Sequence, residues 1–201
     1  MLESAEATPL DGRVARSHRT RAAIVDALIA LLEEGHVQPT VEEVACRAGV
    51  APRTVFQHYP DREALFTAVG ERRQARLETL MGDIDLGAAL DERIAALADQ
   101  RARVYEWIAP VRRAALLMEP FSASVSAALD GLRAVKRAEV RRVFAAELDA
   151  VAADRRPALE AALCAATSFS AWDALRTHQQ LDVDAARAAL TCTLQALLAV
   201  P

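Results

Sequence analysis

The sequence predicts an all-α protein with an N-terminal three-helix helix-turn-helix domain followed by a larger C-terminal helical bundle. Alanine and leucine, both strong helix formers, dominate the long segments of the 201-residue chain. Apolar residues recur at the spacing of one helix face, as at Ile24, Ala27, Leu28, Leu31 and Leu32. Runs that alternate apolar and polar residues, which would indicate strands, are absent.

The composition excludes several classes of protein. Apolar residues make up 53% of the chain, which argues against disorder. There is no uncharged apolar run long enough for a membrane span, and the first twelve residues lack the apolar core of a signal peptide. We therefore expect a cytoplasmic protein. Cys46, Cys164 and Cys192 form no CxxC pair and are expected to be free thiols that act as small apolar residues.

The overall charge argues weakly against a nucleic-acid partner, but the local charge favours one. The formal net charge is −4, whereas a dedicated nucleic-acid coat protein would be basic. Screening by salt makes local charge more important than net charge. Arginines gather in an N-terminal stretch without acids and around the next two predicted helices: Arg13, Arg16, Arg19, Arg21, Arg47, Arg53 and Arg62. The alternative for this arginine run is an ordinary solvated helix start.

The first two helices of the domain have clear ends. Gly35 suits a left-handed stop after the first helix. Thr40 and Glu43 have the spacing of a capping box, in which each side chain bonds the other residue's backbone N–H. Gly49 then ends this short second helix and can adopt the positive φ that a tight interhelical turn requires.

A third helix follows at once. Pro52 suits its first position and Pro60 prevents its continuation. Helix, glycine turn and helix form the geometry of a helix-turn-helix, in which the second helix enters the major groove of DNA. The outward side chains of this helix are all types that read base edges or hold phosphates: Arg53, Thr54, Gln57 and His58.

The remaining chain divides into a linking helix and a second domain. Asp61 is expected to cap a fourth helix that runs through Val69 toward Leu80, and Gly82 marks the boundary. We expect a flexible arm over residues 1–16, the helix-turn-helix domain with its linking helix over 17–81, and a ligand-sensing and dimerisation domain over 82–201. Helices are predicted in this last domain over 88–106, 109–118, 122–150, 156–178 and 182–199.

A wider string of residues gives the motif its specificity. It comprises Gly35, Thr40, Val44, Ala45, Ala48, Gly49, Val50, Thr54, Val55, Phe56, His58, Tyr59, Arg62 and Leu65. This string closely resembles the TetR family of bacterial transcriptional regulators over residues 19–69, and the rest of the chain is similar in layout. The resemblance implies that Thr40 caps and touches a phosphate, that Thr54 and Phe56 belong to the recognition helix, and that Arg62 grips the DNA backbone.

The expected DNA contacts follow from the arginine stretch, the third helix and the resemblance: Arg19, Arg21, Thr40, Arg53, Thr54, Phe56, Gln57, His58, Tyr59 and Arg62. The sequence departs from the family pattern at two points. Ala51 stands where serine is common, so the third helix lacks a side-chain cap, and Phe56 lacks the usual phenolic hydroxyl. Each of four residues also has an interpretation without a DNA contact. Thr40 could be a helix cap only, Phe56 a core residue, His58 a packed or surface histidine, and Arg62 a solvated arginine.

Two C-terminal segments are apolar over most of their circumference, residues 158–175 and 185–198. A helix with two apolar faces must be buried on both, by its own core and by a partner subunit. The resemblance likewise implies that the last two helices pair with their copies in a homodimer. The alternative is a wholly internal core.

The second domain also holds a candidate site for a small-molecule effector. Apolar residues with a few polar neighbours such as Arg112 and Arg113 describe a typical ligand pocket. The candidates are Trp107, Val111, Met118, Phe121, Phe169 and Trp172. An ordinary core explains them equally well, and the sequence does not identify the ligand. No cofactor and no metal are expected.

The function predicted from these features is sequence-specific DNA binding by a regulator, a repressor that a small molecule releases from a palindromic operator. An enzyme is the first alternative, but no phosphate-binding loop or nucleophile elbow is present, and His18, His36, His58 and His178 are scattered. A helical interaction module that has lost DNA binding is the second alternative, suggested by Ala51 and the acidic net charge.

Overall fold

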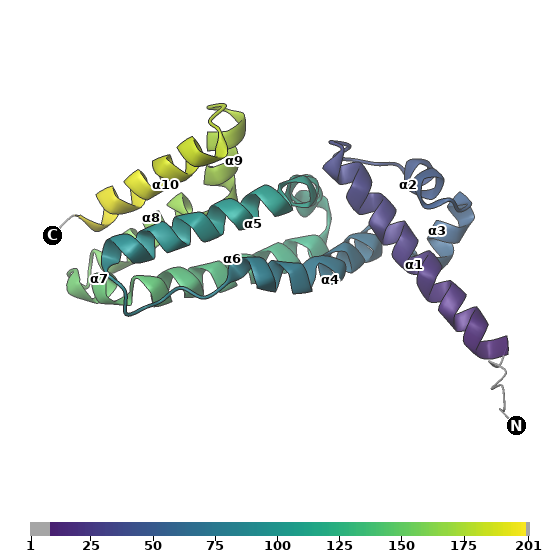
Figure 1. Ribbon diagram of the computed structural model, residues 1–201, viewed down its shortest axis with the longest axis horizontal. Coiled ribbons are helices and arrows are strands. Elements are labelled where there is room, and N and C mark those ends of the chain that lie inside the picture. Colours follow the sequence, from purple (N-terminus) through teal and green to yellow (C-terminus); the bar gives the residue numbers. More distant parts are fainter. Residues whose placement is uncertain (1–8, 200–201) are drawn as a thin grey trace, which may run out of the picture. The chain divides into compact units, whose positions relative to one another are not determined.

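The computed structural model describes residues 9–199, with side chains from residue 12 onward, and every regular element in that range is a helix (Figure 1). This confirms the predicted all-α class. The chain forms two compact units. The N-terminal unit contains the described residues up to 74 together with 110–125, and the C-terminal unit contains 75–109 and 126–199. Two long helices, α4 (Arg62–Met81) and α5 (Leu90–Met118), pass from one unit to the other.

The N-terminal unit is built around the apolar face of α1 (Pro9–Glu33). Against it pack α2 (Val41–Ala48), α3 (Pro52–His58) and the first part of α4. The last part of α5 contributes Ala114 to the same core and leads into a short 3-10 turn, η1 (Glu119–Phe121). The predicted stripe from Ile24 to Leu32 is buried as expected, and Ile24 is 0% exposed.

The first helix begins earlier than the sequence predicts. Residues 9–16, expected in a flexible arm, are helical, whereas residues 1–8 of that arm lie outside the described part of the chain. Between Gly12 and Ile24 there is no proline or other strong breaker, so the helix nucleated by the packed residues continues outward. Residues 12–19 are all exposed.

The C-terminal unit contains the rest of α4 and α5 and most of α6 (Ala123–Val143). The helices that follow are α7 (Ala145–Ala150), α8 (Arg156–Ala166), α9 (Phe169–Thr177) and α10 (Val183–Leu198). Its core includes Leu97, Val104, Phe144, Leu163 and Leu194, each 0% exposed.

Three predicted helix boundaries in the second half differ from the structure. The separate helices expected at 88–106 and 109–118 are one helix, α5, with Pro110 inside it. The single helix expected at 122–150 breaks at Phe144 into α6 and α7. The helix expected at 156–178 breaks after Ala166, where Ser168 accepts a 3.1 Å hydrogen bond from the backbone N–H of Ala171 and caps α9.

Polar contacts join α5 to the C-terminal helices. The hydroxyl of Tyr105 donates to the backbone oxygen of Thr167 at 2.7 Å, and the Tyr105 ring meets Phe169 edge to face at 5.6 Å between centroids. Glu106 accepts from Trp172 Nε1 at 2.8 Å and forms a two-armed ion pair with Arg176. These contacts fix α8 and α9 against α5.

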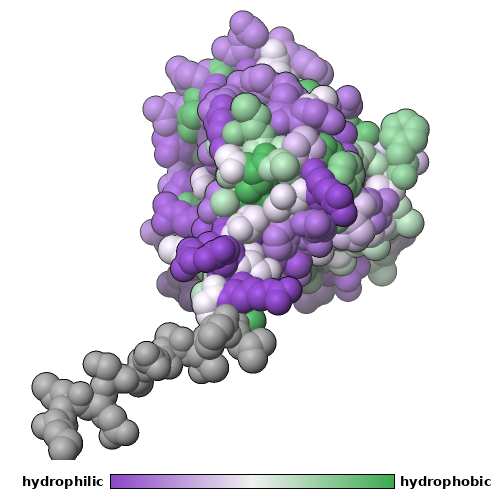
Figure 2. Space-filling model, turned by 90° about the vertical axis from the view of Figure 1, so that its right-hand side faces the viewer, coloured by the Kyte–Doolittle hydropathy of each residue, from purple (hydrophilic) through white to green (hydrophobic). Residues whose placement is uncertain are grey.

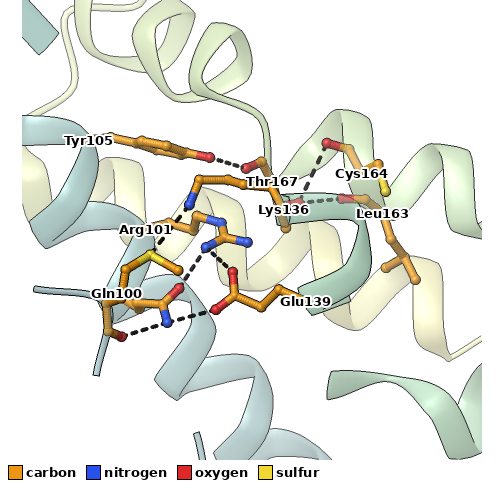
Figure 3. A network of polar contacts seen from close by, with 9 residues as sticks. Gln100, Arg101, Tyr105, Lys136, Glu139, Leu163, Cys164 and Thr167 are labelled. Atoms are coloured by element: carbon orange, nitrogen blue, oxygen red, sulfur yellow. Dashed lines mark hydrogen bonds and ion pairs between the residues drawn. The ribbon is translucent and has the colours of Figure 1, made fainter. Parts of the chain in front are cut away.

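A buried polar cluster lies between α5 and α6 (Figure 3). Arg101 is 0% exposed, and its Nη1 lies 2.6 Å from Gln100 Oε1 and 2.7 Å from Glu139 Oε2. Gln100 Nε2 donates to Glu139 Oε1 at 2.9 Å and to the backbone oxygen of Met81, the last residue of α4, at 2.6 Å. The cluster thus joins α4, α5 and α6.

Glu139 is ionised in this cluster despite its burial. Burial alone would raise its pKa, but the charge of Arg101 and the hydrogen bonds from Gln100 and Arg101 outweigh it, so the pKa is lower than the ordinary value of 4.5. A carboxyl group with a depressed pKa stabilises the folded state fully above its unfolded pKa. That contribution is lost as the pH falls through the folded pKa.

We predict that Glu139→Gln makes the free energy of unfolding less dependent on pH in the acidic range. At pH 7 the free energy of unfolding should fall by about 3 kcal/mol, because Arg101 loses its buried counter-charge. Between about pH 5 and pH 3 the variant should lose less further stability than the wild type, since it has no carboxyl group to protonate. Urea denaturation at several pH values measures both effects.

The matched control is Asp149→Asn, because the Asp149 side chain is 75% exposed in its ion pair with Arg156. It should leave the profile almost unchanged. Parallel profiles for Glu139→Gln and the wild type would contradict the ionised state of Glu139.

Candidate nucleic-acid interface

The turn between α2 and α3 has the predicted helix-turn-helix geometry. Thr40 Oγ1 accepts from the backbone N–H of Glu43 at 3.2 Å, and Glu43 Oε2 accepts from the backbone N–H of Thr40 at 2.7 Å. This confirms the capping box, and the hydrogen bond from the Thr40 backbone is the main cause of a lowered pKa of Glu43. Gly49 ends α2 with φ +67°, and its N–H donates back to the oxygens of Ala45 and Cys46.

The third helix presents a mixed polar and aromatic surface. Pro52 occupies its first turn, and Ala51 provides no side-chain cap, as expected. Arg53 and Gln57 are exposed, Thr54 and His58 are half-buried, and Val55 packs into the core. Phe56 is 54% exposed. The alternative that Phe56 is a core residue is therefore wrong.

Tyr59 differs from the other predicted contacts because its side chain is in the core. It is 2% exposed, and its hydroxyl donates to the backbone oxygen of Arg21 at 3.1 Å. The Arg21 guanidinium carbon lies 4.7 Å from the centre of the Tyr59 ring. Tyr59 therefore positions Arg21 and offers little surface of its own.

A hollow of about 250 Å³ brings several of the predicted phosphate-contact residues together. It is lined by residues of α1, α2, α3 and α4 and of the turns between them, and Thr40, Phe56, Tyr59 and Arg62 are among them. The guanidinium of Arg62 lies 5.7 Å from the centre of the Phe66 ring, which also lines the hollow. On this side of the molecule, hydrophilic side chains surround a small apolar group (Figure 2).

From Gly12 onward, the charges of α1 are segregated along the helix. In this part of the chain the acidic residues lie toward the end of α1 or just after it and are paired: Asp26 with Arg72, Glu33 with Arg73, and Glu34 with Arg47. Arg47 holds Glu34 through two hydrogen bonds of 2.7 and 2.5 Å, which lower the pKa of that carboxyl. Arg47 is thus neutralised and does not add to the basic face, contrary to the sequence-based expectation.

The remaining arginines of this surface have no such partner. Within residues 12–199, no ion pair with an acidic side chain involves Arg13, Arg16, Arg19, Arg21, Arg53 or Arg62. Asp61, expected as a cap, accepts from the backbone N–H of Ala64 at 2.7 Å at the start of α4. Its carboxylate is therefore used by the backbone beside Arg62.

The predicted effector-binding residues do not gather in one place. Val111 and Met118 pack against the N-terminal core, and Phe121 is 89% exposed. Phe169 and Trp172 are buried in the C-terminal unit, and Trp107 is half-buried there. The polar cluster around Arg101 was not among the candidates. Its signal was a charged residue on the apolar stripe of α5, at helical spacing from Leu97 and Ala98.

The helix-turn-helix residues match a known family. Residues 24–69 fit the family described as bacterial regulatory proteins, tetR family. The match covers α2, α3 and the adjoining parts of α1 and α4, and it identifies this part of the chain as a tetR-family helix-turn-helix domain. This agrees with the resemblance that the sequence string around Thr40 and Tyr59 indicates.

Solved structures extend the likeness over most of the chain. A transcriptional regulator from Rhodococcus sp. RHA1 is 20% identical with a TM-score of 0.65, covering 92% of this chain and 99% of its own. A TetR-like transcriptional regulator from the same organism is 17% identical with a TM-score of 0.58, covering 92% and 97%. At these identities the likeness establishes the fold. No curated protein sequence matches the chain.

Two further properties concern the described residues alone. None of the helices within 9–199 is long and apolar enough to span a membrane. The same part of the chain contains no group of three or more histidine, cysteine or acidic side chains placed to hold a metal ion.

We predict that Thr40→Ala lowers the free energy of unfolding of the tetR-family domain by about 1 kcal/mol, because the hydrogen bond from the Glu43 backbone N–H to the Thr40 hydroxyl oxygen is lost. Thr40→Ser, which keeps the hydroxyl oxygen, should cost only a few tenths of that amount. Urea denaturation followed by circular dichroism distinguishes the two variants. Equal losses would show that the hydroxyl oxygen does not cap α2.

Proposed function

We propose that this protein is a homodimeric repressor that binds a palindromic operator through α3 and is released by a small-molecule effector. The observation that carries the proposal is the helix-turn-helix formed by α2, Gly49 and α3, together with nearby arginines that have no acidic partner among the described residues. The family match supports a regulator acting on chromosomal DNA in the cytoplasm, rather than an enzyme.

The proposed reading of DNA divides between two groups of residues. Arg53, Thr54, Gln57 and His58 of α3 face the major groove, where Gln57 can bond an adenine edge with both ends of its amide. Arg19, Arg21 and Arg62 hold phosphates, together with Thr40 and the exposed Phe56 beside the hollow. Tyr59 acts through Arg21, whose side chain its ring supports.

The proposed dimer uses the outer faces of α8 and α10. These two helices contact one another, and Leu163, Leu190 and Leu194 face the core of their own protomer. Their outward sides carry small exposed residues that permit close helix approach: Ala158, Ala161, Ala165, Ala185, Ala188, Cys192 and Ala196. Pairing of these faces in two copies would give the four-helix arrangement and the two-fold symmetry that a palindromic operator requires.

The proposed effector acts within the helical bundle. Release of DNA requires that the effector bind more tightly to a conformation that does not fit the operator. Two helices are suited to transmit such a change, because α4 and α5 each contribute residues to both compact units.

We predict that Gln57→Ala and Arg62→Ala weaken operator binding in different ways. Six phosphate contacts, from Arg19, Arg21 and Arg62 of two subunits, should make the wild-type affinity fall about 10³-fold between 50 and 200 mM salt. Arg62→Ala should weaken all DNA sequences alike and reduce the salt slope by about 2 per dimer. Gln57→Ala should keep the slope and lose about 1–3 kcal/mol of discrimination at one or two base pairs.

Fluorescence anisotropy with DNA from upstream of the coding sequence, and with single-base variants of it, measures both properties. Identical specificity profiles for the two variants would contradict the division of roles. Binding that does not change between the two salt concentrations would indicate an interaction module without a DNA-binding face.

We predict that Ala188→Glu yields a folded monomer with much weaker operator binding, because it places two like charges in the proposed interface. The control is Ala134→Glu, another exposed mid-helix alanine, on α6. Light scattering gives the molar mass and circular dichroism the helix content. A dimeric Ala188→Glu protein with full operator affinity would place the interface elsewhere.

A further inference from the structure

One edge of the Arg101 guanidinium lacks a partner although the side chain is fully buried. Gln100 and Glu139 both lie against Nη1. Among the residues that the structure describes, Nε and Nη2 have no hydrogen-bond acceptor. Nε and Nη2 form the side-on fork of the guanidinium, whose two parallel N–H groups match the two oxygens of a carboxylate. Buried donors of this kind are satisfied in folded proteins by protein, water or ligand.

The same edge is occupied in other arginines of this chain. Arg72 uses Nε and Nη2 to bind the two oxygens of Asp26 at 3.1 and 3.0 Å. Arg176 uses them to bind Glu106 at 2.8 and 3.1 Å. The side chain of Arg72 is 55% exposed and that of Arg176 is 26% exposed, whereas that of Arg101 is 0% exposed. Arg101, which is fully buried, thus lacks on this edge the carboxylate that these two more exposed arginines have.

A second cation lies close to the same cluster. Arg101 and Lys136 both act on the carboxylate of Glu139. The Lys136 ammonium lies 5.4 Å from the centre of the Tyr105 ring, and the Arg101 guanidinium carbon lies 6.0 Å from it (Figure 3). Cations at these distances favour an anionic ligand over a neutral one beside the fork.

We propose that Arg101 is the anchor for a small effector with one carboxylate and an apolar body, bound side-on by Nε and Nη2. The apolar body would lie among the buried groups near the guanidinium, such as the Tyr105 ring, whose centre lies 6.0 Å from the Arg101 guanidinium carbon (Figure 3). This inference rests on the proposed function, because it assigns a chemical class to the effector of the proposed repressor.

The position of Arg101 gives the anion a route to the DNA-binding helices. Gln100, which contacts Arg101, also holds the backbone oxygen of Met81 at the end of α4. Lys136 Nζ lies 3.7 Å from the sulfur of Met81. A carboxylate that draws Arg101 toward itself changes the contacts of Gln100 and thereby those of the last turn of α4. The first turn of that helix carries Arg62.

The test measures binding to the full-length protein without DNA. The probes are sodium butyrate, hexanoate and octanoate, with the primary amides of the same length and sodium sulfate at matched ionic strength as controls. We expect one carboxylate of the series to raise the wild-type Tm by about 3 to 5 °C at ten times its Kd. The amides and sulfate should have no such effect.

Arg101→Lys tests the fork, because lysine keeps the charge without the paired donors. It should weaken carboxylate binding about tenfold or more. The control Arg176→Lys, whose fork is already occupied by Glu106, should keep the wild-type Kd. The comparison of carboxylate with amide on the wild type remains decisive even if Arg101→Lys does not fold.

Each outcome has a definite meaning. Equal stabilisation by amides or by sulfate, no stabilisation by any of the carboxylates, or an unchanged Kd in folded Arg101→Lys would overturn the inference. Operator binding measured without carboxylate tests the proposed function separately. If the protein binds operator but no carboxylate, only this inference is wrong. If it binds carboxylate but no DNA, the proposed repressor function is wrong.

Discussion

The proposed DNA-binding surface depends on the apolar face of α1. Helices α2 and α3 contain eight and seven residues, too few to be stable alone in water. They exist because Val44, Ala45 and Val55 are buried against the core that α1 provides. The turn at Gly49 fixes the direction in which α3 leaves, and the burial of Tyr59 fixes where it ends. The orientation of every side chain that is proposed to read DNA therefore follows from packing on one helix.

Charge segregation explains how an acidic protein can present a basic surface. The net charge of −4 includes carboxylates that are already bound to arginines, such as Asp26 and Glu34. These pairs are short-ranged dipoles and contribute little to the field near α3. The arginines without an acidic partner lie in the first half of α1, on α3 and beside the hollow. The sequence shows the basic stretch directly, but only the structure shows which acids are neutralised.

The elements that sequence reasoning predicted best are those with local signals. The capping box of Thr40, the turn at Gly49 and the start of α3 at Pro52 each depend on a few neighbouring residues, and all agree with the structure. The breaks at Phe144 and Thr167 were missed because their cause is tertiary: burial of Phe144 and the bond from Tyr105 to Thr167 outweigh continued helix propensity. Pro110 was interpreted as a boundary, but a long, well-packed helix tolerates the loss of one hydrogen bond. Arg101 was overlooked because alanine and leucine neighbours suggest an ordinary core.

The exposed first turns of α1 have a consequence for the length of DNA that the protein covers. A helix rises about 1.5 Å per residue, so the eight exposed residues 12–19 carry arginines about 12 Å beyond the packed part of the helix. Under the proposed function these side chains reach phosphates outside the segment that α3 can contact. The footprint on DNA is then set by the length of α1, whereas the bases that are read are set by α3. Footprint and specificity can thus change independently, the first by shortening or lengthening one helix and the second by substitution in another.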